Sequence, residues 1–348
     1  MRSIARISSL VAAAGALLAA PALAQTLTGA GATFPYPVYA KWFDAWHQKT
    51  GIAINYQPIG SGAGIQQVRA GTVDFGASDA ALSDDALRDM PRKVIHFPTV
   101  AGAVVMAYNL PDVAAPLTLS GEVVTGIYLG KITQWNDRRI AALNPGVTLP
   151  ASPILAVHRS DGSGTTNIFT TYLSSASTQW KELVGAGTSV SWPVGIGGKG
   201  NDGVAGLVRQ TPGSVGYVEL AYAMQNRLSF AAMRNRAGRI VHASIASTQA
   251  ALSASAAKLA RDVRAPIVDA AAPDAWPIAG LTFLLVYRDM PDPAKARALA
   301  DFIGWEMHEG QADAQALLYA PLPDAVVKVN EANLRRLTAR GRPLVAAR

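Results

Sequence analysis

The sequence predicts an α/β protein built from two lobes, each with a mostly parallel sheet flanked by helices. Segments with a strand pattern alternate with segments with a helix pattern along most of the chain, which is typical of parallel sheets covered by helices. Two strongly apolar strand patterns, Ala101–Tyr108 and Leu281–Tyr287, enclose a long α/β series of their own. We therefore expect these two strands to cross between a lobe made from both chain ends and an inserted second lobe.

The expected division of the chain follows from this layout. Residues 1–24 are expected to be a signal peptide, residues 25–106 and 275–348 lobe 1, and residues 107–274 lobe 2. Without the first 24 of the 348 residues, 324 remain, which suits two domains of roughly 100–200 residues each. Since α/β sheets bind ligands at the carboxyl ends of their strands, the cleft between the lobes is the expected ligand site.

The N-terminus has the pattern of an export signal. Arg2 and Arg6 flank the start of an apolar run from Ile7 to Ala20, and Pro21-Ala-Leu-Ala24 follows as a cleavage site. The run is shorter than the ~20 residues that a membrane-spanning helix needs. The chain has no cysteine, which excludes disulfides, thiol catalysis and a cysteine-linked lipid anchor. We expect a monomeric periplasmic protein without a lipid anchor.

The first elements can be assigned from their hydrophobic periodicity. Val38, Trp42, Phe43 and Trp46 recur at helical spacing, and Gly51 ends that helix. The expected elements are a strand at Leu27–Ala30, a helix at Pro37–Thr50, a strand at Ile52–Gln57, a helix at Gly62–Ala70 and a strand at Val73–Ser78.

A second series begins after Pro111. Ser120 and Asn136 are favourable N-cap residues for helices that run to Leu129 and Leu143. The further expected elements are a strand at Ile154–Val157, a helix near Asp202–Gln210, a strand at Val215–Glu219, an Ala-rich helix at Thr248–Arg261, helices at Asp292–Met307 and Ala312–Tyr319, and a terminal helix after Pro323.

Four segments at predicted strand ends carry the chemistry of an oxyanion site. Glycines let backbone N–H groups approach a ligand, hydroxyls donate further hydrogen bonds, and an arginine can bind two oxygens at once. Helix N-termini add free N–H groups and a favourable dipole. The segments are Gly29-Ala-Gly-Ala-Thr33-Phe34, Gly60-Ser-Gly-Ala-Gly64, Gly76-Ala-Ser-Asp79 and Arg159-Ser-Asp-Gly-Ser-Gly-Thr165. Together they indicate a receptor for a small tetrahedral oxyanion.

Each of these features also has an ordinary structural explanation. A Gly-rich corner between strand and helix can be only a turn. Ser61 and Ser163 can be plain N-caps, and Asp79 can cap the following helix. Arg159 can form a surface ion pair. The occurrence of all four segments in one chain argues against these explanations jointly.

The motifs resemble the phosphate-binding subunit of the Pst-type ABC importer over nearly the whole mature chain. The resemblance implies a two-lobed periplasmic binding protein fold of type II, inorganic phosphate as ligand, no cofactor, and delivery to membrane permease subunits. The motifs include Leu27-Thr-Gly-Ala-Gly-Ala-Thr-Phe-Pro35, Val73-Asp-Phe-Gly-Ala-Ser-Asp79, Asp161-Gly-Ser-Gly-Thr165, Gly197-Gly-Lys-Gly-Asn-Asp-Gly203 and Gly216-Tyr-Val-Glu219. The implied phosphate ligands are Thr33, Phe34 (through its backbone N–H), Ser61, Asp79, Arg159, Ser163, Gly164 (through its backbone) and Thr165, with Asp161 as the acid that pairs with Arg159.

An acid in an anion site needs a physical reason. Phosphate near neutral pH carries at least one proton, whereas sulfate carries none. An ionised Asp79 can only accept a hydrogen bond, so protonated phosphate can satisfy it while sulfate would face it with an anionic oxygen. We therefore expect Asp79 to reject sulfate and Asp161 to hold the guanidinium of Arg159 in place.

Two other functions match parts of the pattern. A secreted phosphatase would need a base beside a serine nucleophile, but Asp161-Gly-Ser-Gly lacks the G-x-S-x-G order, and His158 is expected on the strand face opposite Arg159. The five histidines show no metal-ligand spacing. A receptor for another tetrahedral oxyanion, such as sulfate or molybdate, is the closer alternative, and Asp79 argues against it.

Two remaining features are expected to carry no specific function. Gly195-Ile-Gly-Gly-Lys-Gly200 satisfies G-x-G-x-x-G, but no clear strand pattern precedes it, so we expect a structural loop. The full chain has a formal net charge of +7, which by itself is compatible with nucleic acid. The export signal and the scattered basic residues, dense only in the tail at Arg335–Arg348, argue against a nucleic-acid partner.

Overall fold

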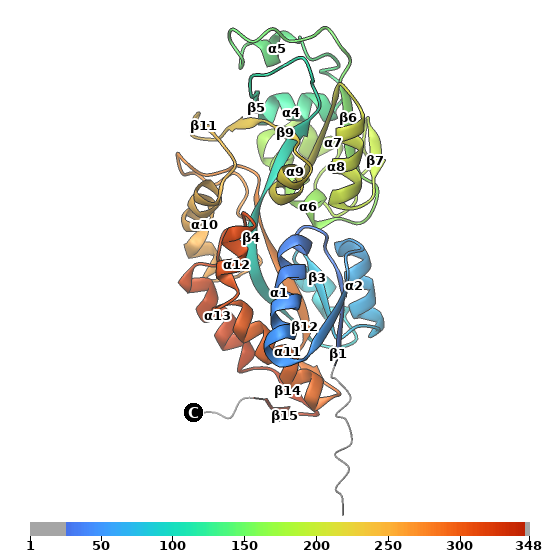
Figure 1. The fold of residues 1–348 in the computed structure, drawn as a ribbon, viewed down its shortest axis with the longest axis vertical. Helices are drawn as coiled ribbons and strands as arrows, with labels where there is room; N and C mark the ends of the chain where they lie inside the picture. Colours follow the sequence, from blue (N-terminus) through green and yellow to red (C-terminus); the bar gives the residue numbers. More distant parts are fainter. Residues whose placement is uncertain (1–25, 345–348) are drawn as a thin grey trace, which may run out of the picture.

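A computed structural model describes residues 26–344 of the chain. The expected signal peptide and the last four residues lie outside the described residues. The described chain is elongated, and its two ends share the lower half in Figure 1, whereas the middle of the chain forms the upper half. The predicted α/β fold class is confirmed.

One large sheet runs through both halves. Its order is β2-β1-β3-β12-β4-β8-β6-β7, and β9 also pairs with β4. The strands are β1 (Thr26–Gly31), β2 (Ala53–Gln57), β3 (Phe75–Ser78), β4 (Val94–Tyr108), β6 (Leu155–Arg159), β7 (Ile196–Gly198), β8 (Ser214–Glu219), β9 (Ser229–Phe230) and β12 (Ala279–Tyr287). In the lower half β1 is parallel to β2 and β3, and in the upper half β6 is parallel to β7 and β8. Their carboxyl ends therefore carry the loops that face the region between the halves.

Strand β4 joins the two halves. Its first part pairs antiparallel with β12 and its last part with β8. At the crossing, the backbone N–H of Val104 donates to the carbonyl of Ile278, so the chain entering β12 runs beside β4. The predicted strand at Ala101–Tyr108 is too short, because β4 starts at Val94. His96 and Thr99 interrupt the apolar pattern there, but both are buried and hydrogen-bonded, to Leu82 N–H and to the Tyr39 hydroxyl.

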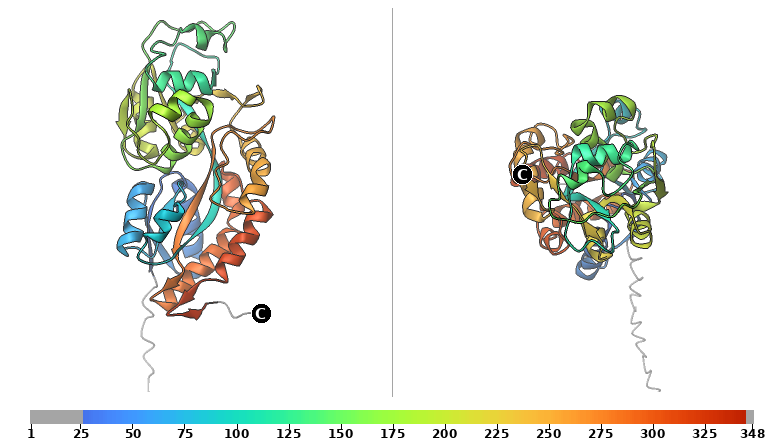
Figure 2. Two further views of the ribbon diagram at one scale, coloured as in Figure 1. Left: turned by 180° about the vertical axis from the view of Figure 1, so that it is seen from behind. Right: turned by 90° about the horizontal axis from the view of Figure 1, so that it is seen from above.

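Helices cover both faces of the sheet (Figures 1 and 2). None of them within residues 26–344 combines the length and apolarity needed to span a bilayer. The helices are α1 (Tyr36–Thr50), α2 (Ser61–Ala70), α3 (Asp84–Arg88), α4 (Gly121–Tyr128), α5 (Arg138–Ala141), α6 (Gly164–Ala176), α7 (Thr178–Leu183), α8 (Gly200–Gln210), α9 (Leu220–Gln225), α10 (Ile245–Leu259), α11 (Pro293–Glu306), α12 (Gln311–Ala316) and α13 (Asp324–Leu334).

Of two helices predicted from their N-cap residues, one has the expected cap and the other does not. Ser120 caps α4 as expected, since its hydroxyl accepts from the backbone N–H of Val123. The helix expected from Asn136 to Leu143 is wrong, because α5 is a single turn. Its cap is Asp137, whose carboxylate accepts from the backbone N–H of Arg139.

Short strands form two small peripheral sheets. The first contains β5 (Thr118–Ser120), β10 (Ala232–Arg234) and β11 (Ile240–Val241), and the second contains β13 (Asp289–Met290), β14 (Thr338–Ala339) and β15 (Arg342–Pro343). Helix α10 contacts β4 and α13, and it lies beside the C-terminal helices in Figures 1 and 2. The lobe boundary after residue 274 stays a prediction.

Aromatic clusters stiffen the two halves. In the lower half, Phe43 of α1 packs against Phe302 of α11 with ring centroids 5.5 Å apart. In the upper half, Phe169 of α6 stacks on Tyr217 of β8 at 4.2 Å. These packed cores hold the strand ends and their loops in fixed positions, as close packing of side chains generally does.

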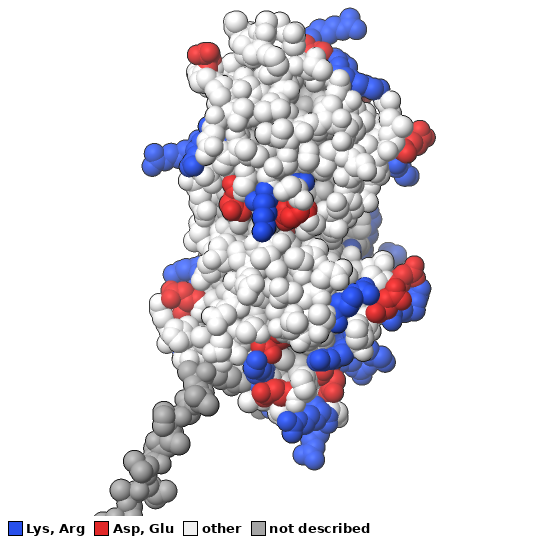
Figure 3. Space-filling view, turned by 90° about the vertical axis from the view of Figure 1, so that its right-hand side faces the viewer, with Lys and Arg blue, Asp and Glu red and all other residues white. Residues whose placement is uncertain are grey.

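Charged side chains stand on the surface in mixed groups. On the face shown in Figure 3, lysines and arginines alternate with aspartates and glutamates, and wide uncharged areas separate the groups. Among residues 26–344, Arg159 is the one buried lysine or arginine. Because burying a cation without a partner is costly, the guanidinium of Arg159 must have a partner inside the protein.

The fold makes one packing prediction at the helix that follows β2. A Cβ added to Gly64 of α2 would lie 2.4 Å from the Cα of Gly31 in β1 and 2.7 Å from the carbonyl of Ala30. We expect Gly64→Ala to lower the free energy of unfolding by about 1–3 kcal/mol through overpacking. Gly206→Ala in α8 is the matched control, because a Cβ there meets nothing within 4 Å. It should be neutral or stabilising by up to ~1 kcal/mol. Urea unfolding measures both, and equal midpoints would contradict the prediction.

Candidate oxyanion site

The four glycine- and hydroxyl-rich segments meet where the two halves face each other. The backbone N–H of Gly62 donates to the carbonyl of Gly162 at 2.8 Å, and the backbone N–H of Gly164 donates to the hydroxyl of Ser61 at 3.0 Å. The lower half contributes the segments after β1, β2 and β3, and the upper half contributes the segment after β6. The residues brought together are Thr33, Phe34, Ser61, Asp79, Arg159, Asp161, Ser163, Gly164 and Thr165.

Arg159 is buried and forms a bidentate ion pair with the partly buried Asp161. Nε of Arg159 donates to Oδ1 of Asp161 at 2.8 Å, and Nη2 donates to Oδ2 at 2.6 Å. The side chains are 1% and 13% exposed. Burial raises the pKa of Asp161, but the hydrogen bonds and charge of Arg159 and the Gly200 N–H outweigh it, so the pKa is lowered overall. The carboxylate therefore stays ionised and aligns the guanidinium, whose Nη1 lies 3.3 Å from the hydroxyl of Thr165.

Asp79 is a second buried carboxylate, held on the other side of the site. Oδ1 accepts from the hydroxyl of Thr282 in β12 at 2.8 Å. A Cβ at Gly164 would lie 2.5 Å from the Cβ of Asp79, so only glycine permits this approach of α6. Burial raises the pKa of Asp79 to about 7, although Thr282, the charge of Arg159 and the backbone N–H of Thr165 act to lower it. The protonated and ionised forms of this carboxyl are therefore both populated near pH 7.

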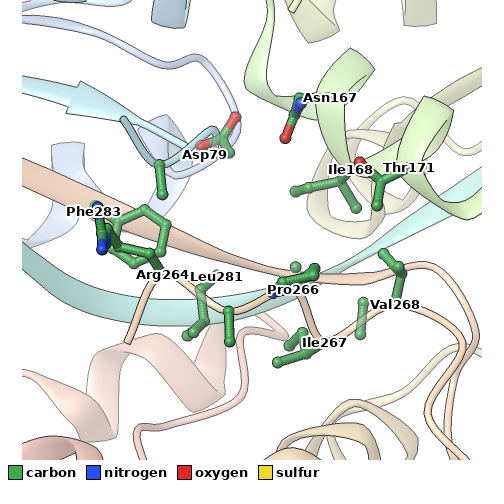
Figure 4. Close-up of a pocket in the computed structure, with 14 residues that line it drawn as sticks. Asp79, Asn167, Ile168, Thr171, Arg264, Pro266, Ile267, Val268, Leu281 and Phe283 are labelled. Carbon is green, nitrogen blue, oxygen red and sulfur yellow. The ribbon is translucent and has the colours of Figure 1, made fainter. Parts of the chain in front are cut away.

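A small cavity lies beside Asp79. Figure 4 shows it between β12, α6 and the segment at residues 264–268. Its volume is about 60 Å³, and Asp79 lies at one end. Much of its wall is apolar, with side chains that include Ile168, Ile267 and Phe283. Because low-polarity surroundings disfavour the charged form of a carboxyl, this wall contributes to the raised pKa of Asp79.

The hydroxyls of the site are anchored by N–H groups. Ser61 Oγ accepts from the backbone N–H groups of Asp79 and Gly164, at 3.3 and 3.0 Å. Thr33 Oγ1 accepts from both the backbone and the side-chain amide of Asn201. Ser163 caps α6 through the backbone N–H of Thr166.

Phe34 lies in the turn before α1 with its ring fully buried. Its carbonyl accepts from the hydroxyl of Tyr319 at 2.7 Å, and the two rings meet edge to face. The Tyr319 hydroxyl also lies 3.0 Å from Oε2 of Glu219 at the end of β8. This contact ties the peptide of Phe34 to both the C-terminal segment and the upper half.

The sequence reasoning missed three residues that contact the site. Asn201 bonds Thr33 and Thr165, Thr282 bonds Asp79, and the hydroxyl of Tyr217 accepts from the backbone N–H of Arg159. The interpretation of residues 195–200 as a structural loop is wrong. Ile196–Gly198 is an edge strand paired with β6, and α8 starts at Gly200 beside the ion pair. The glycine motif was the available signal, but three residues are too short a strand to show a pattern.

Of the ordinary structural explanations, the one for Ser163 is confirmed, because Ser163 is the N-cap of α6. Those for Ser61, Asp79 and Arg159 are wrong. Ser61 is not an N-cap, since Gly60 occupies that position of α2, and α3 is capped by Ser83 rather than by Asp79. Arg159 is buried rather than on the surface. His158 stacks on Trp192 at 4.9 Å and makes no contact with Ser163 among the described hydrogen bonds. Within residues 26–344, no group of three or more His, Asp or Glu side chains could hold a metal ion.

Comparison with known proteins shows which family the chain belongs to. The PBP superfamily domain matches residues 19–308. The phosphate-binding protein PstS of Pasteurella multocida is 46% identical over 306 residues, which cover 88% of each chain. The corresponding protein of Methanocaldococcus jannaschii is 39% identical and covers 86% of this chain and 83% of its own. The chain belongs to the Pst-type phosphate-binding protein family.

Solved structures share the fold of this Pst-type family member. A high-affinity periplasmic phosphate-binding protein solved with bound phosphate superimposes with a TM-score of 0.69 at 22% identity, covering 92% of this chain and 100% of its own. A putative phosphate ABC transporter substrate-binding protein from Clostridium perfringens superimposes with a TM-score of 0.61 at 16% identity, covering 86% and 100%. At these identities the likeness speaks for the two-lobed fold alone.

The raised pKa of Asp79 predicts a pH dependence of stability. The folded protein keeps this proton up to a pH of about 7, whereas an unfolded aspartate loses it near 3.8. The stability due to the protonated carboxyl is thus fully present below the unfolded pKa and is lost as the pH rises through the folded pKa. Asp79→Asn stays neutral, so its unfolding free energy should rise relative to the native protein across this window, by at most about 4 kcal/mol.

The measurement is chemical unfolding of both proteins in phosphate-free buffers across this pH range. Asp85→Asn, at an exposed position after β3, is the control and should show no such trend. A difference between Asp79→Asn and the native protein that is independent of pH would contradict the assignment.

Proposed function

We propose that this protein binds inorganic phosphate between its two halves, without catalysis, and delivers it to the membrane permease subunits of an ABC importer. The main support is that a buried cation, Arg159, and a buried carboxyl, Asp79, lie on opposite sides of one cluster of N–H and O–H donors. A small oxyanion that carries both negative charge and a proton matches this combination. The family relationship supports the same ligand.

The proposed ligands are Thr33, Phe34, Ser61, Asp79, Arg159, Ser163, Gly164 and Thr165, with Asp161 supporting Arg159. Because Asp161 already neutralises much of the guanidinium charge, most of the attraction must come from neutral donors. The start of α6 and the loops after β1 and β2 supply such N–H and O–H groups, as helix N-termini do in other phosphate sites. No cofactor or metal enters this mechanism.

Asp79 is proposed to give the selectivity. When ionised it accepts a hydrogen bond from the O–H of phosphate, while sulfate has no proton and would place two anionic oxygens in contact. A buried polar group left without its partner typically rejects an analogue by ~10⁴ or more. The raised pKa refines the expectation, because protonated Asp79 could donate to sulfate and weaken the discrimination in acid.

Export to the periplasm, release by signal cleavage without a lipid anchor, and action as a monomer are further parts of the proposal. The basic and apolar N-terminal pattern supports export. The arrangement of the chain in two halves around the site supports closure of the halves on the ligand, after which a permease would read the closed surface. Nucleic acid plays no part in this proposal.

The two alternatives have weaker support. An oxyanion without a proton, such as sulfate, would offer ionised Asp79 no hydrogen-bond donor from the ligand. A secreted phosphatase lacks a base beside Ser163, since the nearest histidine in sequence stacks on Trp192. Multiple turnovers of a phosphomonoester that are lost in Ser163→Ala would favour the phosphatase over the receptor.

The proposal predicts that Asp79→Asn keeps phosphate binding but loses discrimination. The amide can donate to an unprotonated oxygen, so sulfate should gain affinity by roughly 100-fold or more. Calorimetric titration of the native and variant proteins with phosphate and with sulfate measures the ratio of the two dissociation constants. An unchanged ratio would remove Asp79 from this role, and a native protein that binds sulfate as well as phosphate would overturn the phosphate assignment.

A second prediction concerns the cation. We expect Arg159→Ala to weaken phosphate binding by about 2–5 kcal/mol, because it removes the buried cation and leaves the partly buried Asp161 charge unpaired beside the anion. Arg139→Ala is the matched control. Arg139 forms the same kind of bidentate pair with an aspartate two positions away, but on the surface. Titration should show normal affinity for this control, and near-normal affinity of Arg159→Ala would count against the placement of the site.

A further inference from the structure

We propose that Asn201 is a positioning residue that turns the threonine hydroxyls of both halves into obligate hydrogen-bond donors to the anion. The inference rests on the proposed phosphate site and concerns how that site is oriented. Asn201 follows the first residue of α8 and is fully buried. It lies between Thr33, in the loop after β1, and Thr165, in the first turn of α6.

Asn201 supplies three donor contacts to these two hydroxyls. Its backbone N–H and its Nδ2 donate to Thr33 Oγ1, at 3.2 and 2.9 Å. The same Nδ2 donates to Thr165 Oγ1 at 3.1 Å. The guanidinium of Arg159 is the second donor to Thr165, through Nη1 at 3.3 Å.

The orientation of the Asn201 amide is determined by its surroundings. The backbone N–H of Glu219 donates at 2.9 Å to Oδ1, which must therefore be the carbonyl oxygen. The amide nitrogen then faces the two threonines. A flipped amide would set two N–H groups against each other and leave the threonine oxygens without this donor.

The consequence follows from the capacity of a hydroxyl. A threonine hydroxyl has one proton to donate and two lone pairs to accept. Two N–H donors occupy the lone pairs of Thr33 Oγ1, and two occupy those of Thr165 Oγ1. Each hydroxyl can then only donate, and its proton is available for a ligand oxygen.

Ser61 shows the same arrangement built from backbone groups. Its oxygen accepts from the N–H groups of Asp79 and Gly164, so it too is left with a proton to donate. All three hydroxyls therefore donate to lone pairs of the ligand, which are most basic on its unprotonated oxygens, whereas ionised Asp79 requires an oxygen that carries a proton. Asn201 thus orients the hydroxyls that donate to the ligand, whereas Asp79 is the group that accepts from it.

Asn201→Ala tests this role in combination with Thr33→Val. The single Asn201→Ala change should weaken phosphate binding about tenfold or more, the order expected for loss of preorganised hydrogen bonds. In the Thr33→Val background the same change should cost clearly less, roughly threefold, since one of its two hydroxyl targets is gone. Substitutions of residues that act through one network have binding free-energy changes that do not add. A purely structural effect of Asn201 would be the same in both backgrounds.

Asn201→Asp provides a variant that keeps the shape and the acceptor for the Glu219 N–H. Its carboxylate would accept hydrogen bonds from the threonine hydroxyls and so turn their protons away from the anion. Phosphate binding at about pH 8 should therefore fall roughly 100-fold or more. Relative to the native protein, affinity should recover as the pH falls toward about 5, because burial at this position raises the pKa of the introduced carboxyl and its protonated form regains a donor. Asn226→Ala, a partly buried amide in the same half that bonds Tyr222 O, is the control and should bind normally.

Calorimetric titration with inorganic phosphate gives all of these values, and circular dichroism checks that each variant is folded. Equal losses for Asn201→Ala in both backgrounds, or Asn201→Asp within about threefold of the native affinity at about pH 8, would overturn the role of Asn201. Lack of binding by the native protein would instead overturn the proposed function itself.

Discussion

The ion pair between Arg159 and Asp161 is the interaction on which the rest of the site depends. Among residues 26–344, Arg159 is the one lysine or arginine removed from solvent, and a buried cation is stable only with a well-aligned partner. Asp161 supplies two parallel hydrogen bonds, and the Gly200 N–H holds the carboxylate in turn. The turn between β6 and α6, the short strand β7 and the start of α8 are all arranged around this pair.

The site combines opposite demands on a single small ligand. The cation is already paired, and Asp79 lies in surroundings so little polar that its pKa rises to about 7. The fixed charge is therefore small, and oriented dipoles carry most of the attraction. Donor-only hydroxyls favour bare oxygens, and a buried carboxyl favours a protonated one. In the proposed function, selectivity arises because the ligand must meet both demands among buried side chains.

Much of the fold and of the candidate site could be predicted from local sequence. Glycines, hydroxyls, one arginine and two acids at successive strand ends indicated an anion site. Ser163 and Ser120 act as helix caps because capping needs only neighbouring residues. Asn201 and Thr282 could not be assigned in this way. Thr282 lies 203 positions from Asp79, and Asn201 lies 168 positions from Thr33. Nothing in the local pattern of either residue distinguishes it from a structural one.

The sequence by itself determined the α/β class, the order of most elements and the oxyanion-binding chemistry of the four loops, because periodicity, capping and glycine-rich turns are local properties. Only the tertiary structure decided which hydroxyls are left as donors, how far burial raises the pKa of Asp79, and that β4 starts at Val94 and runs through both halves. These properties depend on groups brought together by the antiparallel crossing of β4 and β12 and by the approach of α6 and α8. Hydrogen-bond capacity and desolvation are set by that surrounding structure and not by the residue alone.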